Sequence, residues 1–171
     1  LDLIHSAPMP ANPDADFWSG RRVLLTGHTG FKGGWLALWL DRLGAQTTGI
    51  SLAPTARPNL YELARVADRT TGYIIDLRDA DAVHRIIAQA DPEVVFHLAA
   101  QPLVLASYRD PLGTFSTNVQ GTANLLDALR PLRQLRAVIA ITTDKVYCNR
   151  EHTFPYRETD ALGGHDPFSA S

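Results

Sequence analysis

The feature that most constrains this chain is an apolar run that ends in three regularly spaced glycines. Residues 21–26 read Arg-Arg-Val-Leu-Leu-Thr, and Gly27, Gly30 and Gly33 follow with two residues between each pair. An apolar, helix-like segment, Phe31–Leu43, comes next. A strand, a tight glycine turn and a helix N-terminus together suit a pyrophosphate, because the backbone approaches the phosphates and the helix end attracts anions. The pattern predicts dinucleotide binding; the alternative is a glycine-rich turn without a ligand.

Composition narrows the function classes. The 171 residues suit one domain, and 45% apolar content with a net charge of −2 favours neither disorder nor a nucleic-acid or acidic-lipid partner. A single cysteine, Cys148, rules out an internal disulfide framework, is expected to be structural and fits a reducing cytoplasm. No apolar run approaches the ~20 residues of a membrane span. Residues 1–16 hold three prolines and three aspartates and are expected to be a flexible leader before a domain at 17–171.

Apolar runs alternate with helical patterns along the rest of the chain. Helices are expected over 31–43, over a segment capped by Asp79 or Asp81 with an apolar face from Val83 to Ala90, and from Pro111 to Leu129. Trp35, Leu36 and Trp39 are expected in the core of the first helix. Strands apolar on both faces between helices predict an α/β fold, a Rossmann-type doubly wound parallel sheet covered on both sides. The expected strands are 23–26, 47–52, 72–75, 94–99 and 137–142.

Ligands of such sheets bind at the carboxyl ends of the strands. The candidate functional residues follow those ends: Gly27–Gly33, Ser51, Asp76, Ala99–Gln101 and Thr142–Lys145. Each also has a purely structural interpretation. Asp76 and Thr142–Lys145 would cap strand ends, with Asp144 and Lys145 as a solvated ion pair. His97 is expected to be a packed histidine, and Asn118 has the alternative of a satisfied core amide. No metal-ligand spacing such as Cys-x-x-Cys is present.

Taken together, several motifs resemble the extended short-chain dehydrogenase/reductase family of nucleotide-sugar enzymes. Within it, Thr143-Asp144-Lys145 resembles the CDP-glucose 4,6-dehydratases, where many other 4,6-dehydratases carry Thr-Asp-Glu. The resemblance covers residues ~17–171. The motifs are a glycine signature at 26–33, an adenine-side motif at Asp76-Leu77-Arg78-Asp79, a strand-four motif at His97-Leu98-Ala99-Ala100-Gln101 and a central-helix motif at Asn118-Val119-Gln120-Gly121-Thr122.

The resemblance implies bound NAD. The acid expected at the end of the second strand, where it would meet the ribose hydroxyls, is absent. Ser51 is the candidate there, and Lys32 or Arg57 would suit a phosphate, so the residues alone leave NAD and NADP both open. For His28, cofactor contact and packing are equally open. The implied cofactor-binding residues are Gly27, His28, Gly30, Phe31, Lys32, Gly33, Ser51, Asp76, Leu77, Ala99, Ala100, Gln101, Asn118 and Thr142.

The resemblance also implies a reaction, the dehydration of a nucleotide-activated glucose to a 4-keto-6-deoxy sugar nucleotide. Thr143 would hydrogen-bond the C4 oxygen. Asp144 would protonate the departing C6 hydroxyl, and Lys145 would assist proton removal at C5. For these roles Asp144 must stay protonated and Lys145 partly neutral, which needs burial or suitable neighbours.

Two departures from the family pattern matter. The catalytic tyrosine of Tyr-x-x-x-Lys falls at Phe168, which has no hydroxyl, so impaired oxidation is expected. Family members are longer, and most of the C-terminal substrate-binding part is lacking. Alternatives are another nucleotide-sugar dehydratase or epimerase, or a catalytically silent dinucleotide-binding protein. The family also implies a homodimer through two long helices, here Pro111–Leu129 and one starting near Ser169.

Overall fold

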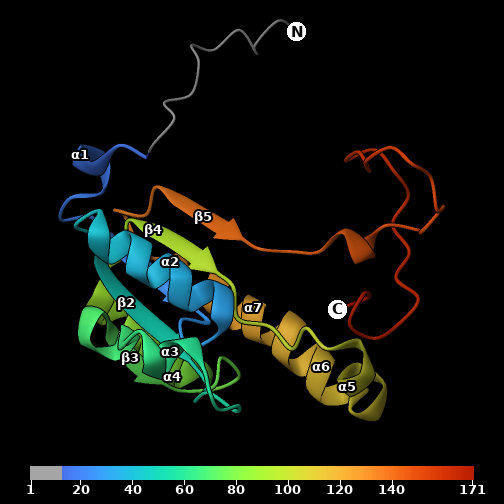
Figure 1. Cartoon of the computed structure of the whole chain (residues 1–171), viewed down its shortest axis with the longest axis horizontal. Helices are drawn as coiled ribbons and strands as arrows, with labels where there is room; N and C mark the ends of the chain where they lie inside the picture. Colours follow the sequence, from blue (N-terminus) through green and yellow to red (C-terminus); the bar gives the residue numbers. More distant parts are fainter. Residues whose placement is uncertain (1–12) are drawn as a thin grey trace, which may run out of the picture.

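A five-stranded parallel sheet forms the centre of the chain (Figure 1). The computed structural model describes residues 13–171. The sheet order is β3-β2-β1-β4-β5, which confirms the expected doubly wound α/β fold. Most of the predicted leader lies outside the described residues, and Ala15 and Asp16 belong to a short helix, α1 (Ala15–Trp18). The strands are β1 (Arg22–Thr26), β2 (Gln46–Ser51), β3 (Thr71–Ile74), β4 (Val94–His97) and β5 (Ala137–Ala140).

Strand β1 lies in the middle of the sheet and pairs with β2 on one side and β4 on the other. Its side chains alternate between the two faces. Leu24 packs into the core on one face, whereas Val23 and Leu25 pack into smaller clusters on the other. Because all three are buried, β1 is apolar on both faces, as its sequence predicts.

Two helices cover the Leu24 face: α4 (Ala80–Ala90) and α7 (Gly121–Leu129). Asp79 caps α4, because its carboxylate accepts a hydrogen bond from the Ala82 amide at 3.0 Å. The predicted apolar face of α4 packs against the sheet through Val83, Ile86 and Ile87. The core on this face consists of Leu24, Ile50, Leu77, Val83, Ile86, Ile87, Val95, Leu125, Ala128 and Leu129.

The opposite face is covered by α2 (Phe31–Arg42), with α3 (Leu60–Leu63) and the 3₁₀ turn η1 (Val66–Arg69) beside it. Leu36 packs against the core, as expected. The expectation for Trp35 and Trp39 is wrong, since they are 56% and 52% exposed. Gly33, Gly34, Ala37 and Leu40 form the buried stripe instead, and the tryptophans fall on the outer side.

The helix expected from Pro111 to Leu129 consists of three consecutive segments. These are α6 (Pro111–Phe115), the π-helix η2 (Ser116–Gln120) and α7. The Gly121 amide donates to the Ser116 carbonyl, five residues back, so the helix widens by one residue around Asn118. A short helix that the sequence analysis missed, α5 (Val104–Arg109), precedes them.

Beyond α7 the chain is less well covered. All four residues of β5 are exposed, so the predicted covering on both faces is wrong for this strand. The following segment contains the 3₁₀ turn η3 (Asp144–Val146) and extends away from the sheet (Figure 1). Stacked Tyr147 and Tyr156 rings, 5.0 Å apart, hold part of it together. None of the helices within residues 13–171 is long and apolar enough to cross a membrane.

The ring of His28 lies against the sheet, next to glycines on β2 and β3. It is fully buried, and the hydrogen atoms of Gly49 on β2 and Gly72 on β3 leave the space it fills. A Cβ added at Gly49 would lie 2.5 Å from Cγ of His28, and one at Gly72 would lie 2.9 Å from Nε2. Tyr61 closes the pocket with an edge-on ring 5.6 Å away. Burial lowers the pKa of His28, which favours the neutral ring.

We expect Gly49→Ala to lower the free energy of unfolding by about 1–3 kcal/mol, because the new methyl group overlaps the His28 ring. Chemical denaturation measures the change. In a His28→Ala background the same substitution should cost much less, because the obstructing ring is gone. Equal costs in both backgrounds would show that the His28 ring is not the reason why position 49 requires glycine.

Candidate functional site

The glycine loop brings β1, α2 and β4 into close contact. Gly27 has a φ of +79°, and a Cβ there would lie 3.0 Å from the Ala99 amide nitrogen. A Cβ on Gly33 would lie only 2.0 Å from the Gly27 carbonyl oxygen. Both positions therefore require glycine, one for its backbone conformation and one for the close approach of the helix to the turn. The result is the tight strand-to-helix turn that the sequence predicts.

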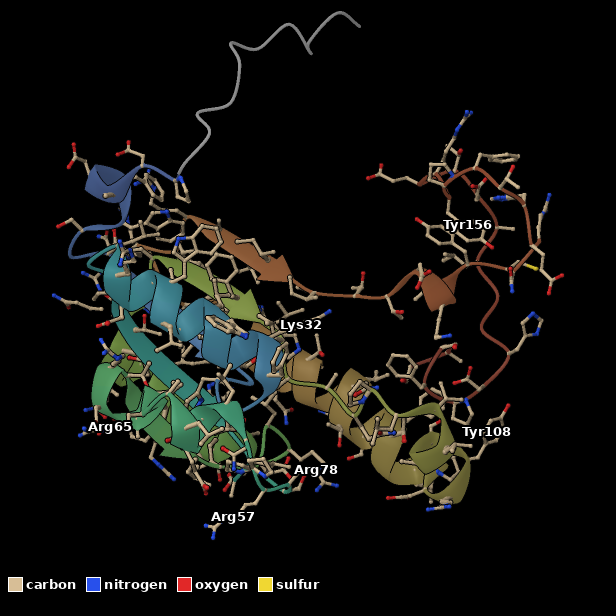
Figure 2. The ribbon with its side chains drawn as sticks, viewed as in Figure 1. Lys32, Arg57, Arg65, Arg78, Tyr108 and Tyr156 are labelled. Carbon is tan, nitrogen blue, oxygen red and sulfur yellow. The ribbon has the colours of Figure 1, made fainter. Side chains whose placement is uncertain are left out.

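The N-terminus of α2 is open to an anion. Its N-cap is Gly30, which has no side chain to cap the free amides, and its first turn carries no acidic residue. Lys32 lies in that first turn, at the end of α2 that begins at the glycine loop (Figure 2). Phe31 is exposed beside it. Free amides, the positive end of the helix dipole and a lysine together suit a phosphate group.

Ser51 ends β2 next to this loop. The Thr29 hydroxyl donates to the Leu52 carbonyl at 2.7 Å, so in its 2.7 Å contact with Ser51 it accepts the serine proton. Ser51 is buried, and its hydroxyl oxygen accepts no hydrogen bond from the described residues. Arg57, in the following loop, bonds Glu62 at 3.1 Å and is highly exposed.

Asp76 follows β3 and holds Arg78. The guanidinium donates to both carboxylate oxygens, the shortest contact being 2.6 Å, and these hydrogen bonds lower the pKa of Asp76. Figure 2 places Arg78 and Arg57 at the same end of the molecule. The side chain of Leu77 points into the core instead, and buried Asn124 fixes its carbonyl with a 2.9 Å hydrogen bond.

Asn118 clamps the loop that follows β4. Its Oδ1 accepts from the Gln101 amide at 2.8 Å, and its Nδ2 donates to the Gln101 carbonyl at 3.2 Å. Asn118 also donates to the hydroxyl of Ser171 at 2.8 Å. The Gln101 side chain donates to Thr114 on α6 at 2.9 Å. The widened turn thus fixes the loop that starts at Ala99 and Ala100. The backbone of Ala99 lies against Gly27.

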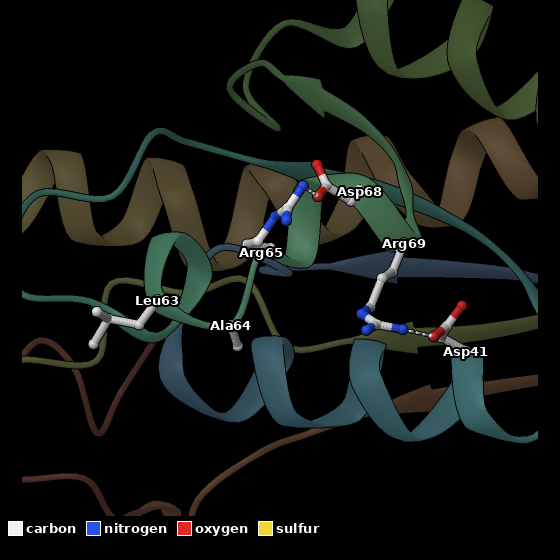
Figure 3. A pocket seen from close by; sticks show the side chains of 6 residues that line it. All are labelled: Asp41, Leu63, Ala64, Arg65, Asp68 and Arg69. Carbon is white, nitrogen blue, oxygen red and sulfur yellow. Dashed lines mark hydrogen bonds and ion pairs between the residues drawn. The ribbon is translucent and has the colours of Figure 1, made fainter.

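Two of the shallow pockets on the surface of the described residues bear on an anion site. One, of about 180 Å³, lies beside the clamp and is lined by Arg78, Gln101 and Thr114 among others. The larger, of about 410 Å³, lies near the far end of α2 (Figure 3). Both of its arginines are paired, Arg65 with Asp68 and Arg69 with Asp41, so it offers no free charge to an anion.

The proposed catalytic residues lie apart from the packed core. Thr142, Asp144 and Lys145 are exposed, and Thr143 caps η3 through the Lys145 amide at 3.3 Å. The Thr143 hydroxyl also donates to Asp144 at 3.3 Å. Residues 13–171 therefore do not provide the burial that the acid and base roles need. Phe168 is half-buried in a turn that Asp166 caps through Ser169.

Several polar residues shape the site although the sequence did not single them out as functional. Thr26 is buried, and its hydroxyl accepts from the amides of Leu98 and Ala99. Thr29 bonds Ser51 at the end of β2, and Thr114 accepts from the Gln101 side chain. Thr122 contacts His97 on β4, and Asn124 donates to the Leu77 carbonyl after β3. Their positions at strand ends and inside apolar helices are a usable signal, because a buried polar group requires a partner. Within the described residues no His, Cys, Asp and Glu cluster suits a metal ion.

Known proteins with similar sequences identify the family of this chain. The model of the family described as GDP-mannose 4,6 dehydratase matches residues 24–171. The CDP-glucose 4,6-dehydratase of Salmonella typhimurium is 48% identical over 92% of this chain and 44% of its own length. The CDP-paratose 2-epimerase of Salmonella typhi is 33% identical over 81% of this chain and 41% of its own. The chain thus spans less than half the length of these curated relatives.

Solved structures agree with the fold. A UDP-glucose 4-epimerase of Thermus thermophilus, solved as a complex with NAD, matches with a TM-score of 0.75 and 30% identity, over 87% of this chain and 46% of its own. One from Brucella ovis, also in complex with NAD, matches with a TM-score of 0.75 and 25% identity, over 88% and 44%. With the family model covering most of the chain, the sequence and the fold lead to one assignment. The chain belongs to the GDP-mannose 4,6 dehydratase family, within the extended short-chain dehydrogenases/reductases.

Proposed function

We propose that this chain is the dinucleotide-binding part of a nucleotide-sugar 4,6-dehydratase that uses NAD and acts on CDP-glucose. The glycine turn carries the proposal. Gly27 and Gly33 stand where a Cβ atom would clash with neighbouring backbone, and the N-terminus of α2 has no side-chain cap. The 48% identity to a CDP-glucose 4,6-dehydratase supports the reaction and the sugar nucleotide. The NAD complexes of two structural relatives support the choice of cofactor.

Residues at the carboxyl ends of β1 to β4 support a dinucleotide site. The pyrophosphate would lie at Gly30 and Lys32, a ribose at Ser51, and the adenine near Asp76. The loop from Ala99 to Gln101 would border the nicotinamide end. NAD supplies a hydride acceptor and donor for the internal redox step.

The chain's own side chains would move the protons. Asp144 would give a proton to the C6 hydroxyl as it leaves as water, and Lys145 would assist removal of the C5 proton. Thr143 would hydrogen-bond the C4 oxygen. The product is the 4-keto-6-deoxy sugar nucleotide, formed with loss of one water. A base for the C4 hydroxyl proton is missing at Phe168.

Phe168 favours a second candidate, a catalytically silent dinucleotide-binding protein. A phenyl ring neither accepts nor donates a proton. A chain that keeps Phe168 would therefore retain the dinucleotide site and lose the oxidation step. Both candidates share the dinucleotide site and differ only in turnover. The assays below distinguish them.

We also propose a homodimer, through the α6–α7 region. Leu112, Phe115, Val119 and Leu126 are all exposed and lie at spacings of three, four and seven residues, so they form an apolar stripe along one side of the region. A stripe of exposed apolar side chains suits a self-complementary interface.

The chain is expected to bind NAD+ in a calorimetric titration, and NADP+ more weakly. Asp76→Asn should weaken NAD+ binding about fivefold or more, because the carboxylate that orders the adenine side is lost. Asp81→Asn, at an exposed aspartate on α4, is the matched control and should leave affinity unchanged. A folded chain that binds neither dinucleotide would disprove the cofactor site.

Turnover is tested in a chimera in which this chain replaces the matching part of the Salmonella typhimurium relative. With Phe168 we expect very slow conversion of CDP-glucose, and Phe168→Tyr should raise the rate about 100-fold or more, because the proton acceptor returns. Adding Asp144→Asn to the tyrosine variant should remove most of that gain. An inactive tyrosine chimera that still binds NAD+ would favour the silent protein.

Light scattering tests the dimer. Leu112 is 83% exposed on α6, and Leu112→Glu should shift the mass from dimer to monomer, because a charge would be buried in the interface. Leu63 on α3, 75% exposed and outside the stripe, is the control, and Leu63→Glu should leave the mass unchanged. A monomeric wild-type chain would argue against the interface.

A further inference from the structure

His97 connects the glycine loop to the widened helical turn. It is buried at the end of β4, and both of its ring nitrogens have partners. Nδ1 lies 2.6 Å from the hydroxyl of Thr26, the residue before Gly27. Nε2 lies 2.9 Å from the hydroxyl of Thr122, on α7. The ring therefore spans the distance between two elements that carry different parts of the site.

The direction of each hydrogen bond follows from the groups at the two ends. Thr122 donates its hydroxyl proton to the Asn118 carbonyl, so toward His97 it accepts, and Nε2 must carry a hydrogen. At the other end the Thr26 oxygen already accepts from the amides of Leu98 and Ala99. Its proton is free to be donated to Nδ1. A neutral ring with its hydrogen on Nε2 satisfies every group.

The far end of this chain of hydrogen bonds is the Asn118 clamp. Thr122 holds the Asn118 carbonyl, and the side chain of the same asparagine holds the Gln101 backbone. The near end is Thr26, which receives the Ala99 amide at 3.1 Å. Both ends thus position the loop between Ala99 and Gln101, which would border the dinucleotide.

We infer that His97, as the neutral Nε2–H tautomer, is a positioning residue that ties the turn carrying Asn118 to the end of β1 and so sets the shape of the dinucleotide site. The inference rests on the proposed function for its effect on binding. Its contacts are independent of that function, because they exist within this chain alone. His97 touches no reacting atom in this role and acts through Thr26 and Thr122.

The tautomer is tested directly by a two-bond nitrogen–proton NMR correlation of the wild-type chain. We expect the pattern of a neutral ring protonated on Nε2. A ring protonated on Nδ1 would overturn the inference, because Thr122 would then have no donor and Thr26 no acceptor. The spectrum needs no ligand, so this result stands whether or not NAD+ binds.

Thr122→Val tests the connection without altering the histidine. The substitution keeps the shape but removes the oxygen, so His97 loses an acceptor and the Asn118 carbonyl loses a donor. We expect NAD+ affinity to fall about five- to tenfold and the Gln101 amide to exchange its hydrogen faster. Thr122→Ser, which restores the hydroxyl, should recover both.

Thr47→Val is the matched control, because the Thr47 hydroxyl on β2 is buried and makes no hydrogen bond with the described residues. It should change neither the affinity nor the exchange of Gln101. A Thr122→Val variant that is merely less stable, with wild-type affinity and wild-type Gln101 exchange, would overturn the inference. Absence of NAD+ binding by the wild-type chain would instead overturn the proposed function, while the tautomer and exchange still decide on the connection.

Discussion

The close contact between α2 and the turn before it is the constraint on which the site depends. The helix begins so near the Gly27 carbonyl that position 33 admits no side chain. This contact aims the free amides of α2 at the edge of the sheet, where β1, β2 and β4 end. It also places His28 under the turn, between glycines of two neighbouring strands. One short segment therefore shapes both the candidate anion site and the packing beneath it.

Much of the fold could be predicted from the sequence because its signals are local. Apolar runs, glycines and capping aspartates determined the strands, α2 and α4 to within a few residues. The π-turn at Asn118 was not predictable, because a helical apolar pattern does not reveal one extra residue in a turn. Trp35 and Trp39 were misplaced for a related reason, since periodicity locates a buried stripe only when polar residues mark the opposite side.

The residues predicted on the cofactor side are held in place by contacts within this chain, whereas those predicted on the catalytic side are not. The glycine turn, Ser51, Asp76 and Asn118 are held at strand ends or against them by contacts within this chain. Thr26, Thr29 and Thr122 lie within the predicted motifs, but their part in holding these loops was not predicted, because a hydroxyl in an apolar run looks like any other position of the strand or helix. The cofactor roles and the catalytic roles both stay predictions, and the roles of Thr143, Asp144 and Lys145 carry a further requirement. Their proposed proton chemistry needs a shielded environment, which residues 13–171 alone leave open to solvent.

The exposed edge of β5 has a consequence for handling the molecule. Its outer backbone amides and carbonyls meet no other strand in the described part of the chain, and its side chains are short, apolar and uncharged. An edge of this kind is a template on which a second chain adds in register. This edge would therefore favour self-association by backbone pairing at high protein concentration.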